Sequence, residues 1–259
     1  MPVRVAVTGA AGRMGRLIVK NVVEDEELEL AQAFDVREVG KDAGELAGVG
    51  KTGVKIEDAS NLMEKLEADV LVDFTAADAA VNNICIASSK GVKLVVGTTG
   101  FTEEHWKKIR ECCKVPAVIS PNFSVGVNVF WELIRKCAEL LGNYDLEVLE
   151  MHHRFKKDAP SGTALKAVEV LREVVGEKKI VTGREGICPR EDEIGVFAIR
   201  GGDVVGEHTV YFIGMGERIE ITHRAWSRQA FAGGAIKAVK WISKVEEPKI
   251  YGMKDVLGL

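Results

Sequence analysis

The segment from Glu150 to Ala164 holds the densest set of residues suited to acid–base chemistry. It reads EMHHRFKKDAPSGTA and places His152 four residues before Lys156. An imidazole titrates near neutral pH, and an ammonium group can both donate a proton and attract an anion. The segment ends in Ser-Gly-Thr at a predicted helix start, where backbone amides can bind a carboxylate. We therefore predict a site for a small dianionic ligand with proton donors beside it.

Other interpretations of this segment remain open. His152 and His153 could bind a metal ion, although the sequence spacing suggests no third ligand. Ser161 could act only as the N-cap of the helix. Lys157 could be a solvated surface charge and nothing more.

A second motif is the glycine loop GAAGRMG at residues 9–15. Its glycines occupy relative positions one, four and seven, whereas the common dinucleotide fingerprint has them at one, three and six. The loop nevertheless joins a predicted strand to a predicted helix, where glycine lets the backbone approach a pyrophosphate. Asp35 ends the next predicted strand, and a carboxylate there can bind the adenosine ribose. We predict NADH or NADPH as the cofactor; the alternative is a glycine turn with an incidental aspartate.

The sequence permits both nicotinamide cofactors. Asp35 alone favours NADH, because a carboxylate repels the 2′-phosphate of NADPH. Arg37 and Arg13 could each pair with that phosphate.

The elements that must position these motifs alternate between strand and helix in the first half of the chain. Short β-branched runs alternate with helical patterns, which predicts right-handed βαβ units and a doubly wound parallel sheet. The predicted strands are 3–7, 28–34, 70–74, 93–96 and 117–120, and the predicted helices are 13–24, 60–66, 77–90 and 103–112.

The pattern changes after about Asn122. Polar and apolar residues alternate in the later strands, which predicts a mostly antiparallel sheet with one open face. We therefore predict an α/β protein with an N-terminal Rossmann-like domain, residues 1–122 with 234–259, and a smaller α+β domain, residues 123–233. The predicted later elements are helices at 127–141, 162–175 and 231–245 and strands at 146–151, 194–200, 207–213 and 218–225.

Composition excludes several classes of function. The net charge of −4 provides no basic field for nucleic acid or an anionic membrane surface. No apolar run approaches the roughly 20 residues that span a bilayer, and the N-terminus does not read as a signal peptide. The five cysteines lack the spacing of a disulfide framework. We predict a cytoplasmic protein whose cysteines are all reduced thiols.

These motifs together resemble the dihydrodipicolinate reductase family, also called 4-hydroxy-tetrahydrodipicolinate reductases. Residues 150–164 are similar to its His-His-x-x-Lys-x-Asp-Ala-Pro-Ser-Gly-Thr-Ala signature. The resemblance implies reduction of 4-hydroxy-tetrahydrodipicolinate to tetrahydrodipicolinate by NAD(P)H, in lysine and diaminopimelate biosynthesis. Other similar stretches are DFT at 73–75, GTTGF at 97–101, NFSVGVN at 122–128, RGG at 200–202, GEHT at 206–209, ERIEITHRA at 217–225 and YGMKDVL at 251–257.

The resemblance also implies roles for individual residues. His152 and Lys156 are the expected proton-transfer residues, and the dicarboxylate substrate is expected to contact His153, Ser161, Gly162 and Thr163. The family pattern implies a homotetramer built through the second-domain sheets, without a metal. The expected cofactor contacts are Gly9, Ala10, Ala11, Gly12, Arg13, Met14, Asp35, Arg37, Gly97, Thr98, Thr99, Ser120, Pro121, Asn122 and Phe123.

Two departures from the family pattern and two rival functions remain. Pro121 stands where many relatives have alanine. Val36 stands where some relatives have arginine, and this second departure leaves 2′-phosphate recognition open.

Another two-domain dehydrogenase, related to aspartate or homoserine dehydrogenase, would explain the glycine loop but not residues 152–163. A nucleotide-sensing regulator would add a DNA-binding module, and the sequence shows none.

Overall fold

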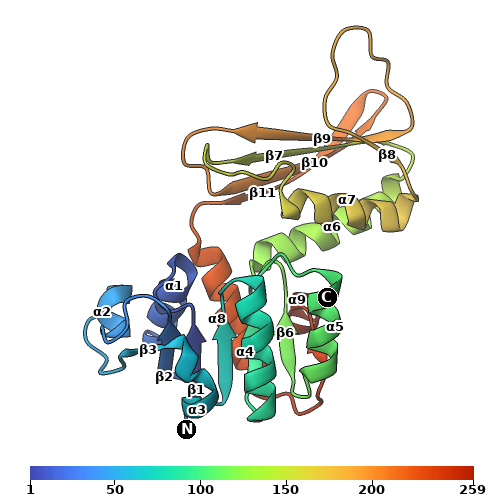
Figure 1. The fold of residues 1–259 in the computed structure, drawn as a ribbon. Coiled ribbons are helices and arrows are strands. Elements are labelled where there is room, and N and C mark those ends of the chain that lie inside the picture. Colours follow the sequence, from blue (N-terminus) through green and yellow to red (C-terminus); the bar gives the residue numbers. More distant parts are fainter. The chain divides into compact units, whose positions relative to one another are not determined.

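The computed structural model describes all residues 1–259, which divide into two compact units (Figure 1). The first unit contains residues 1–125 and 231–258, and the second contains residues 126–230 with Leu259. The chain therefore leaves the first unit once and returns to it through its last long helix.

The first unit is built on a seven-stranded sheet in the order β12-β6-β5-β4-β1-β2-β3, and every pairing is parallel. The predicted Rossmann-like, doubly wound sheet is confirmed. Its strands are β1 Val3–Thr8, β2 Leu28–Asp35, β3 Ile56–Asp58, β4 Val70–Asp73, β5 Lys93–Val96, β6 Ala117–Ile119 and β12 Ile250–Tyr251. Its helices are α1 Arg13–Val23, α2 Ala43–Ala47, the 3-10 turn η1 Ala59–Asn61, α3 Leu62–Lys65, α4 Ala77–Ser89, α5 Glu103–Cys112, α8 Gln229–Ile242 and α9 Met253–Leu257.

Both faces of this sheet are covered, as the apolar strands require. In β1, Val5 and Val7 belong to one core cluster, which also contains residues of α1 and α8. Ala6 belongs to the other, which also contains residues of α4 and α5. Successive residues of a strand point to opposite faces, so a fully apolar strand supplies two cores at once.

The second unit packs helices α6 and α7 against one face of a five-stranded sheet in the order β11-β10-β7-β9-β8 (Figure 1). Alternation is clear in β7, where every second residue from Leu146 to His152 is buried. The elements are α6 Val125–Leu141, β7 Asp145–His152, α7 Gly162–Val175, β8 Lys179–Val181, β9 Glu193–Arg200, β10 Gly206–Gly214 and β11 Glu217–Ala225.

This second sheet is mixed, whereas we expected a mostly antiparallel one. Strand β10 pairs antiparallel with β7 and β11, but β9 pairs parallel with β7 and β8. The chain passes through α7 between β7 and β8, and such a crossover connects parallel strands. The alternating pattern predicted one open face but carries no information on strand direction.

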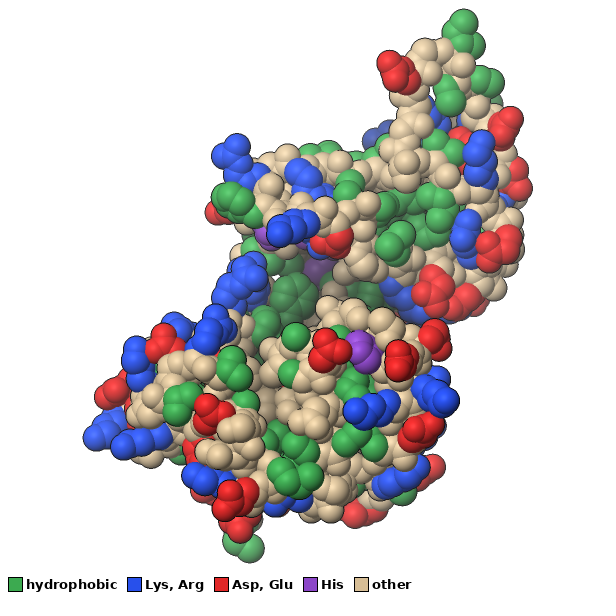
Figure 2. All heavy atoms as spheres, in the orientation of Figure 1, with side chains coloured by type: hydrophobic (Ala, Val, Ile, Leu, Met, Phe, Trp, Pro, Cys, Tyr) green, Lys and Arg blue, Asp and Glu red, His purple; other side chains and the backbone are tan.

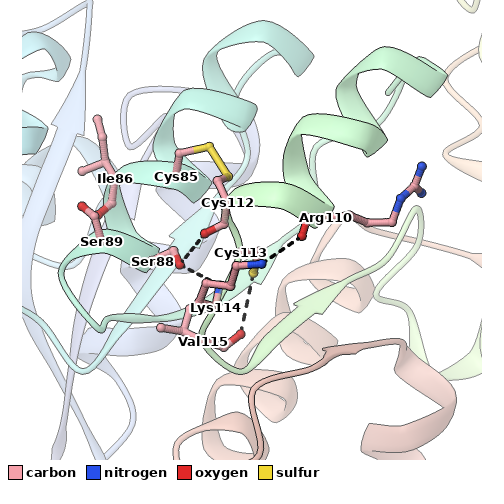
Figure 3. The surroundings of a disulfide bond; sticks show 9 residues. All are labelled: Cys85, Ile86, Ser88, Ser89, Arg110, Cys112, Cys113, Lys114 and Val115. Carbon is pink, nitrogen blue, oxygen red and sulfur yellow. Dashed lines mark hydrogen bonds between the residues drawn. A yellow bond between two sulfur atoms is a disulfide. The ribbon is translucent and has the colours of Figure 1, made fainter.

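Cys85 of α4 and Cys112 of α5 form a disulfide (Figure 3). The prediction of five reduced thiols is therefore wrong for these two, whereas Cys113, Cys137 and Cys188 are free. The two bonded cysteines are 27 residues apart. They meet because α4 and α5 pack on the same side of the sheet, which cysteine spacing does not reveal.

Basic and acidic side chains are interspersed over both units on the face drawn in Figure 2. This mixture agrees with the small net charge of −4. None of the helices combines the length and apolar character that a membrane crossing requires.

Candidate active site

The glycine loop between β1 and α1 is closely packed. Gly9 has a φ of +73°, and a Cβ on it would lie 2.7 Å from the carbonyl oxygen of Phe74. A Cβ on Gly15 would lie 2.0 Å from the carbonyl oxygen of Gly9. Gly12 is the N-cap of α1 and brings no capping side chain to the helix amides. The loop thus leaves a helix N-terminus open to an anion, as a dinucleotide pyrophosphate requires.

Asp35, at the end of β2, holds this loop from one side. Its Oδ2 accepts the N–H of Ala11 at 2.9 Å, and its Oδ1 accepts the N–H of Arg37 at 2.9 Å. The Arg37 side chain is 68% exposed, and its Nε lies 3.7 Å from Oδ1. Asp35 and Arg37 border a pocket of about 380 Å³ together with Gly9 and Gly12. These residues fit the adenosine end of a nicotinamide dinucleotide.

The other loop residues that we expected at the cofactor lie in different surroundings. The N–H of Ala10 bonds to the carbonyl of Phe34 at 3.2 Å, and Met14 packs against the core. Arg13 is exposed at the first position of α1. The side chains of Ala10 and Met14 therefore serve packing, and Arg13 is free to reach an anion.

Asp73, at the end of β4, is a fully buried carboxylate that our sequence analysis did not assign to the site. Its Oδ2 accepts the Thr8 hydroxyl at 2.8 Å and the Asn83 amide at 2.7 Å. Its Oδ1 accepts the Thr98 hydroxyl at 2.7 Å and the Thr75 hydroxyl at 2.9 Å. One carboxylate therefore ties together the ends of β1, β4 and β5 and helix α4. An aspartate as the last residue of an otherwise apolar strand was the signal that could have revealed it.

The two remaining cofactor segments follow β5 and β6, at the same edge of the sheet as the glycine loop. A Cβ on Gly97 would lie 2.1 Å from the Phe74 ring, so any larger residue would force this ring to move. Phe123 is buried and packs on Phe74 at a ring distance of 5.9 Å. Neither segment lines the 380 Å³ pocket. Thr98 and Ser120 are buried, whereas Thr99 and Pro121 are exposed and Asn122 is half-buried.

In the second unit, strand register brings together residues that are distant in sequence. Glu150 of β7 lies opposite His208 of β10, which lies opposite His223 of β11. Two positions further along β7, His152 lies opposite Arg200 of β9. Residues two apart in a strand share a face, so Glu150 and His152 both continue the buried face of β7.

Glu150 is fully buried and saturated with hydrogen bonds. Its Oε2 accepts from His152 Nδ1 at 2.6 Å and Arg200 Nη1 at 2.8 Å. Its Oε1 accepts from Arg200 Nη2 at 2.7 Å and from the N–H of Ser161 at 3.0 Å. Burial by itself would raise the pKa of Glu150, but the hydrogen bonds from His152 and Arg200 outweigh burial and bring the pKa to about 2. The carboxylate is therefore ionised near neutral pH.

This ionised carboxylate decides the tautomer of His152. A carboxylate only accepts hydrogen bonds, so we assign the proton to Nδ1, which leaves Nε2 for proton exchange. A Cβ on Gly206 would lie 2.9 Å from Nε2, so the absence of a side chain at position 206 leaves space for the His152 ring. Glu150 therefore occupies Nδ1, and Nε2 is the ring nitrogen that it leaves without a hydrogen bond.

His208 packs edge-on against His152, with their ring centres 5.1 Å apart. Its Nε2 lies 3.0 Å from the hydroxyl oxygen of Ser161. Burial, and then the neighbouring His152, lower the pKa of His208 to about 3, so this ring is neutral. Ser161 also accepts the N–H of Ala164 at 3.2 Å. Ser161 is therefore the N-cap of α7, as one of our interpretations held, and it also binds His208.

Lys156 lies in the loop between β7 and α7 and is held by Asp158. Its Nζ lies 2.9 Å from each carboxylate oxygen of Asp158, and this pairing lowers the pKa of Asp158. The carbonyl of Asp158 accepts from Arg200 Nη2 at 2.7 Å. The ammonium group of Lys156 is thus fixed within the same network as His152.

The other predicted substrate residues lie around this network. Gly162 and Thr163 are the first two residues of α7. His153 is half-buried next to Phe155, at a ring distance of 6.3 Å. Lys157 is exposed. No group of three or more His, Cys, Asp or Glu side chains is placed to hold a metal ion.

Comparisons with known proteins cover the whole chain. The family model described as "Dihydrodipicolinate reductase, N-terminus" matches residues 3–123, and the model for the C-terminus of the same enzyme matches residues 126–257. The chain is 61% identical to the 4-hydroxy-tetrahydrodipicolinate reductase of Archaeoglobus fulgidus, over 98% of this chain and 99% of the relative. It is 54% identical to the enzyme of that name from Methanosarcina acetivorans, over 99% of this chain and 100% of the relative.

Solved structures agree with these matches. A dipicolinate-bound dihydrodipicolinate reductase from Paenisporosarcina sp. TG-14 superimposes with a TM-score of 0.79 at 25% identity, covering 98% of this chain and 99% of that one. A myo-inositol dehydrogenase from Lactobacillus casei, solved with NAD(H) and myo-inositol, shares the fold alone, with a TM-score of 0.63 at 15% identity over 99% of this chain and 91% of that one. The chain therefore belongs to the dihydrodipicolinate reductase family.

Proposed function

We propose that this chain reduces 4-hydroxy-tetrahydrodipicolinate to tetrahydrodipicolinate with NAD(P)H, in lysine and diaminopimelate biosynthesis. The substrate loses its hydroxyl group as water, and the ring gains one hydride and one proton. The observation that carries this proposal is the second-unit network, in which a buried carboxylate holds His152 beside the start of α7. A dehydrogenase of a rival family would explain the glycine loop but not this network.

The first unit would hold the cofactor, which supplies the hydride when bound. The N-terminus of α1 and the glycine loop would bind the pyrophosphate, and Asp35 the adenosine ribose. The exposed guanidinium of Arg37 borders the same pocket and would pair with a 2′-phosphate. We therefore propose that the enzyme accepts both NADH and NADPH.

The second unit would bind the substrate and move its protons. Backbone amides at Gly162 and Thr163 would hold a carboxylate at the start of α7. His152 would exchange its proton through Nε2, because Nδ1 is bound to Glu150. The ammonium group of Lys156 would donate a proton and attract the dicarboxylate.

The proposal extends to assembly and location. Helices α6 and α7 cover one face of the second sheet, and the opposite face carries apolar side chains that are half-buried or exposed. A homotetramer built through these faces would cover them, in a cytoplasmic enzyme. Light scattering after gel filtration would test this with a mass four times 28.2 kDa. The apolar side chains on the open face include Leu149, Met151, Phe197, Ile199, Tyr211 and Ile213.

The direct test is nicotinamide oxidation followed by absorbance. The substrate is generated in situ from pyruvate and aspartate semialdehyde by the synthase of the preceding step, and a reaction without synthase is the control. We expect synthase-dependent turnover with both NADH and NADPH. A folded protein that binds nucleotide but turns over neither would favour a dehydrogenase of another substrate or a nucleotide sensor.

A further inference from the structure

We propose that Glu150 is the positioning residue of the active site, because its carboxylate holds the His152 ring and the start of α7 together. The inference rests on the proposed function for the roles of His152 and α7. It concerns how these two groups are kept in register with each other.

The Glu150 carboxylate binds two different groups, one through each oxygen. Its two oxygens lie in one rigid plane; Oε2 binds the imidazole of His152 at 2.6 Å, and Oε1 binds the backbone N–H of Ser161 at 3.0 Å. Any rotation of the carboxylate would break both hydrogen bonds. The proton-exchanging ring and the predicted carboxylate-binding amides of α7 therefore share one support.

Arg200 adds a positive charge next to the Glu150 carboxylate. Its guanidinium donates to both oxygens of Glu150, at 2.8 and 2.7 Å, in the planar two-point geometry that arginine forms with carboxylates. Arg200 Nη2 also donates to the carbonyl of Asp158, whose side chain holds Lys156. The Glu150–Arg200 pair thus contacts all three segments that carry the predicted substrate-side residues.

A purely structural role explains this pair poorly. Taking the Glu150 carboxylate out of water carries a desolvation cost, and apolar residues of similar volume often stabilise a fold as well as a buried ion pair or better. Glu150 continues a row of Leu146 and Val148, which are apolar and buried in the same face of β7. An apolar residue could therefore extend the core at this position, but it could not orient the His152 ring.

The tautomer of His152 depends on the negative charge of Glu150. While Glu150 is ionised it accepts only, so Nδ1 of His152 keeps the proton and Nε2 stays available. A glutamine at position 150 could donate an N–H to Nδ1, which would move the proton to Nε2. His152 would then have the wrong tautomer. A catalytic histidine in the wrong tautomer loses much of its effect on kcat.

Two matched variants test the proposal. Glu150→Gln and Arg200→Gln both break the same ion pair, but only the first removes the anion that binds His152. Each is compared with wild type for kcat and KM, for NADH affinity by calorimetry, and for folding by circular dichroism. The protein has five histidines, so selective ¹⁵N labelling resolves their ring nitrogens, and His152→Gln assigns the His152 signals.

We expect the wild type and Arg200→Gln to show His152 protonated at Nδ1 at about pH 9, where imidazoles are neutral. Glu150→Gln should show Nε2–H at His152 and lose about 100-fold in kcat, the range of one general acid–base group. Arg200→Gln should lose about tenfold or less in kcat, and NADH affinity should stay within about twofold in both.

Several outcomes would overturn the inference. Equal losses of kcat in the two variants with an unchanged His152 tautomer would reduce Glu150 to a structural ion pair. An Nε2–H tautomer in the wild type would overturn it even if Glu150→Gln does not fold. Absence of turnover in a wild type that shows the expected tautomer would instead count against the proposed function, and not against the hold of Glu150 on His152.

Discussion

Each unit contains one fully buried carboxylate among its candidate site residues, and the two carboxylates are stabilised by different kinds of hydrogen-bond donor. Asp73 of the first unit accepts hydrogen bonds from neutral groups, the hydroxyls of Thr8, Thr75 and Thr98 and the amide of Asn83. Glu150 of the second unit is bound by the guanidinium of Arg200 and by an imidazole.

This difference matches the function that we propose for each unit. Neutral donors can fix the loops around a cofactor without adding a titrating group, and the cofactor supplies its own reactive atom. Proton transfer needs a titratable side chain whose orientation is set, and the charge of Glu150 beside His152 would serve the proton transfer that we propose for the second unit. We therefore expect damage at Asp73 to weaken cofactor binding and damage around Glu150 to lower turnover.

The largest effect should follow from removing the proton-transfer groups themselves. His152→Gln should lower kcat by about 1,000-fold, within the range of general acid–base catalysis, and Lys156→Ala should lose most turnover as well. Both variants lie in the second unit, so NADH affinity measured by calorimetry should stay within about twofold of wild type. A collapse of NADH binding in either variant would contradict the division of labour between the units.

Removing the disulfide tests a stabilising device of the first unit. Cys85→Ser opens a cross-link between residues 27 positions apart, and loop-closure entropy predicts a loss of about 3 kcal/mol in the free energy of unfolding. Cys113→Ser is the matched control, because Cys113 is free and adjacent to the bonded Cys112. Urea unfolding of both variants would measure the difference; equal losses would mean that the cross-link itself contributes nothing.

Asp73→Asn should sharpen the contrast between the two carboxylates. The new amide group would face donors, leaving buried hydroxyls without an acceptor at a cost of about 2 kcal/mol. We expect the KM for NADH to rise about tenfold, with a smaller change in kcat. Asp58→Asn, at an exposed carboxylate that accepts from Ser60, is the control and should stay near wild type. A kcat loss without a change in KM would contradict a role for Asp73 in cofactor binding.

The second unit should lose stability in mild acid because of His208. The pKa of His208 falls from 6.5 to about 3 on folding, so below pH 6.5 the unfolded chain binds a proton that the folded chain does not. Stability should fall by about 2 kcal/mol between pH 6.5 and pH 5. Glu150, with its pKa lowered from 4.5 to about 2, should add a further loss only below about pH 4.5.

His208→Asn separates these two contributions. The variant should lack the decline between pH 6.5 and pH 5 in a series of urea unfolding curves, whereas the loss below pH 4.5 should persist. An unchanged decline in this variant would assign it to other groups, among them His223, whose pKa burial also lowers.

The smallest effect concerns cofactor choice in the first unit. Arg37→Ala should raise the KM for NADPH about tenfold, the worth of one exposed phosphate contact, and change the KM for NADH less than about twofold. Arg13→Ala is the matched comparison, since it was the other candidate for the 2′-phosphate. A larger NADPH effect at Arg13 would move phosphate recognition to the start of α1.

Local patterns in the sequence predicted much of the fold. Strand β5 and helices α5 and α7 have the predicted bounds. Their apolar periodicity and flanking breakers, and in the two helices a capping residue, all lie within a few residues of each other. The short elements α2, β3, β8, β12 and α9 were not predicted. Strands such as β3 and β12 exist only because a neighbouring strand offers hydrogen bonds.

The sequence by itself determined the chemistry that is contiguous along the chain. The glycine loop, Asp35, the His152–Lys156 pair and the Ser161 cap could all be read from residue types and spacing. Only the tertiary structure decided which distant residues serve them. Sheet register brings Arg200 and His208 to Glu150, and helix packing joins Cys85 to Cys112. Asp73 collects donors from β1, from α4 and from the loops after β4 and β5. Such lateral contacts depend on pairing between segments tens of residues apart, and no local pattern records that pairing.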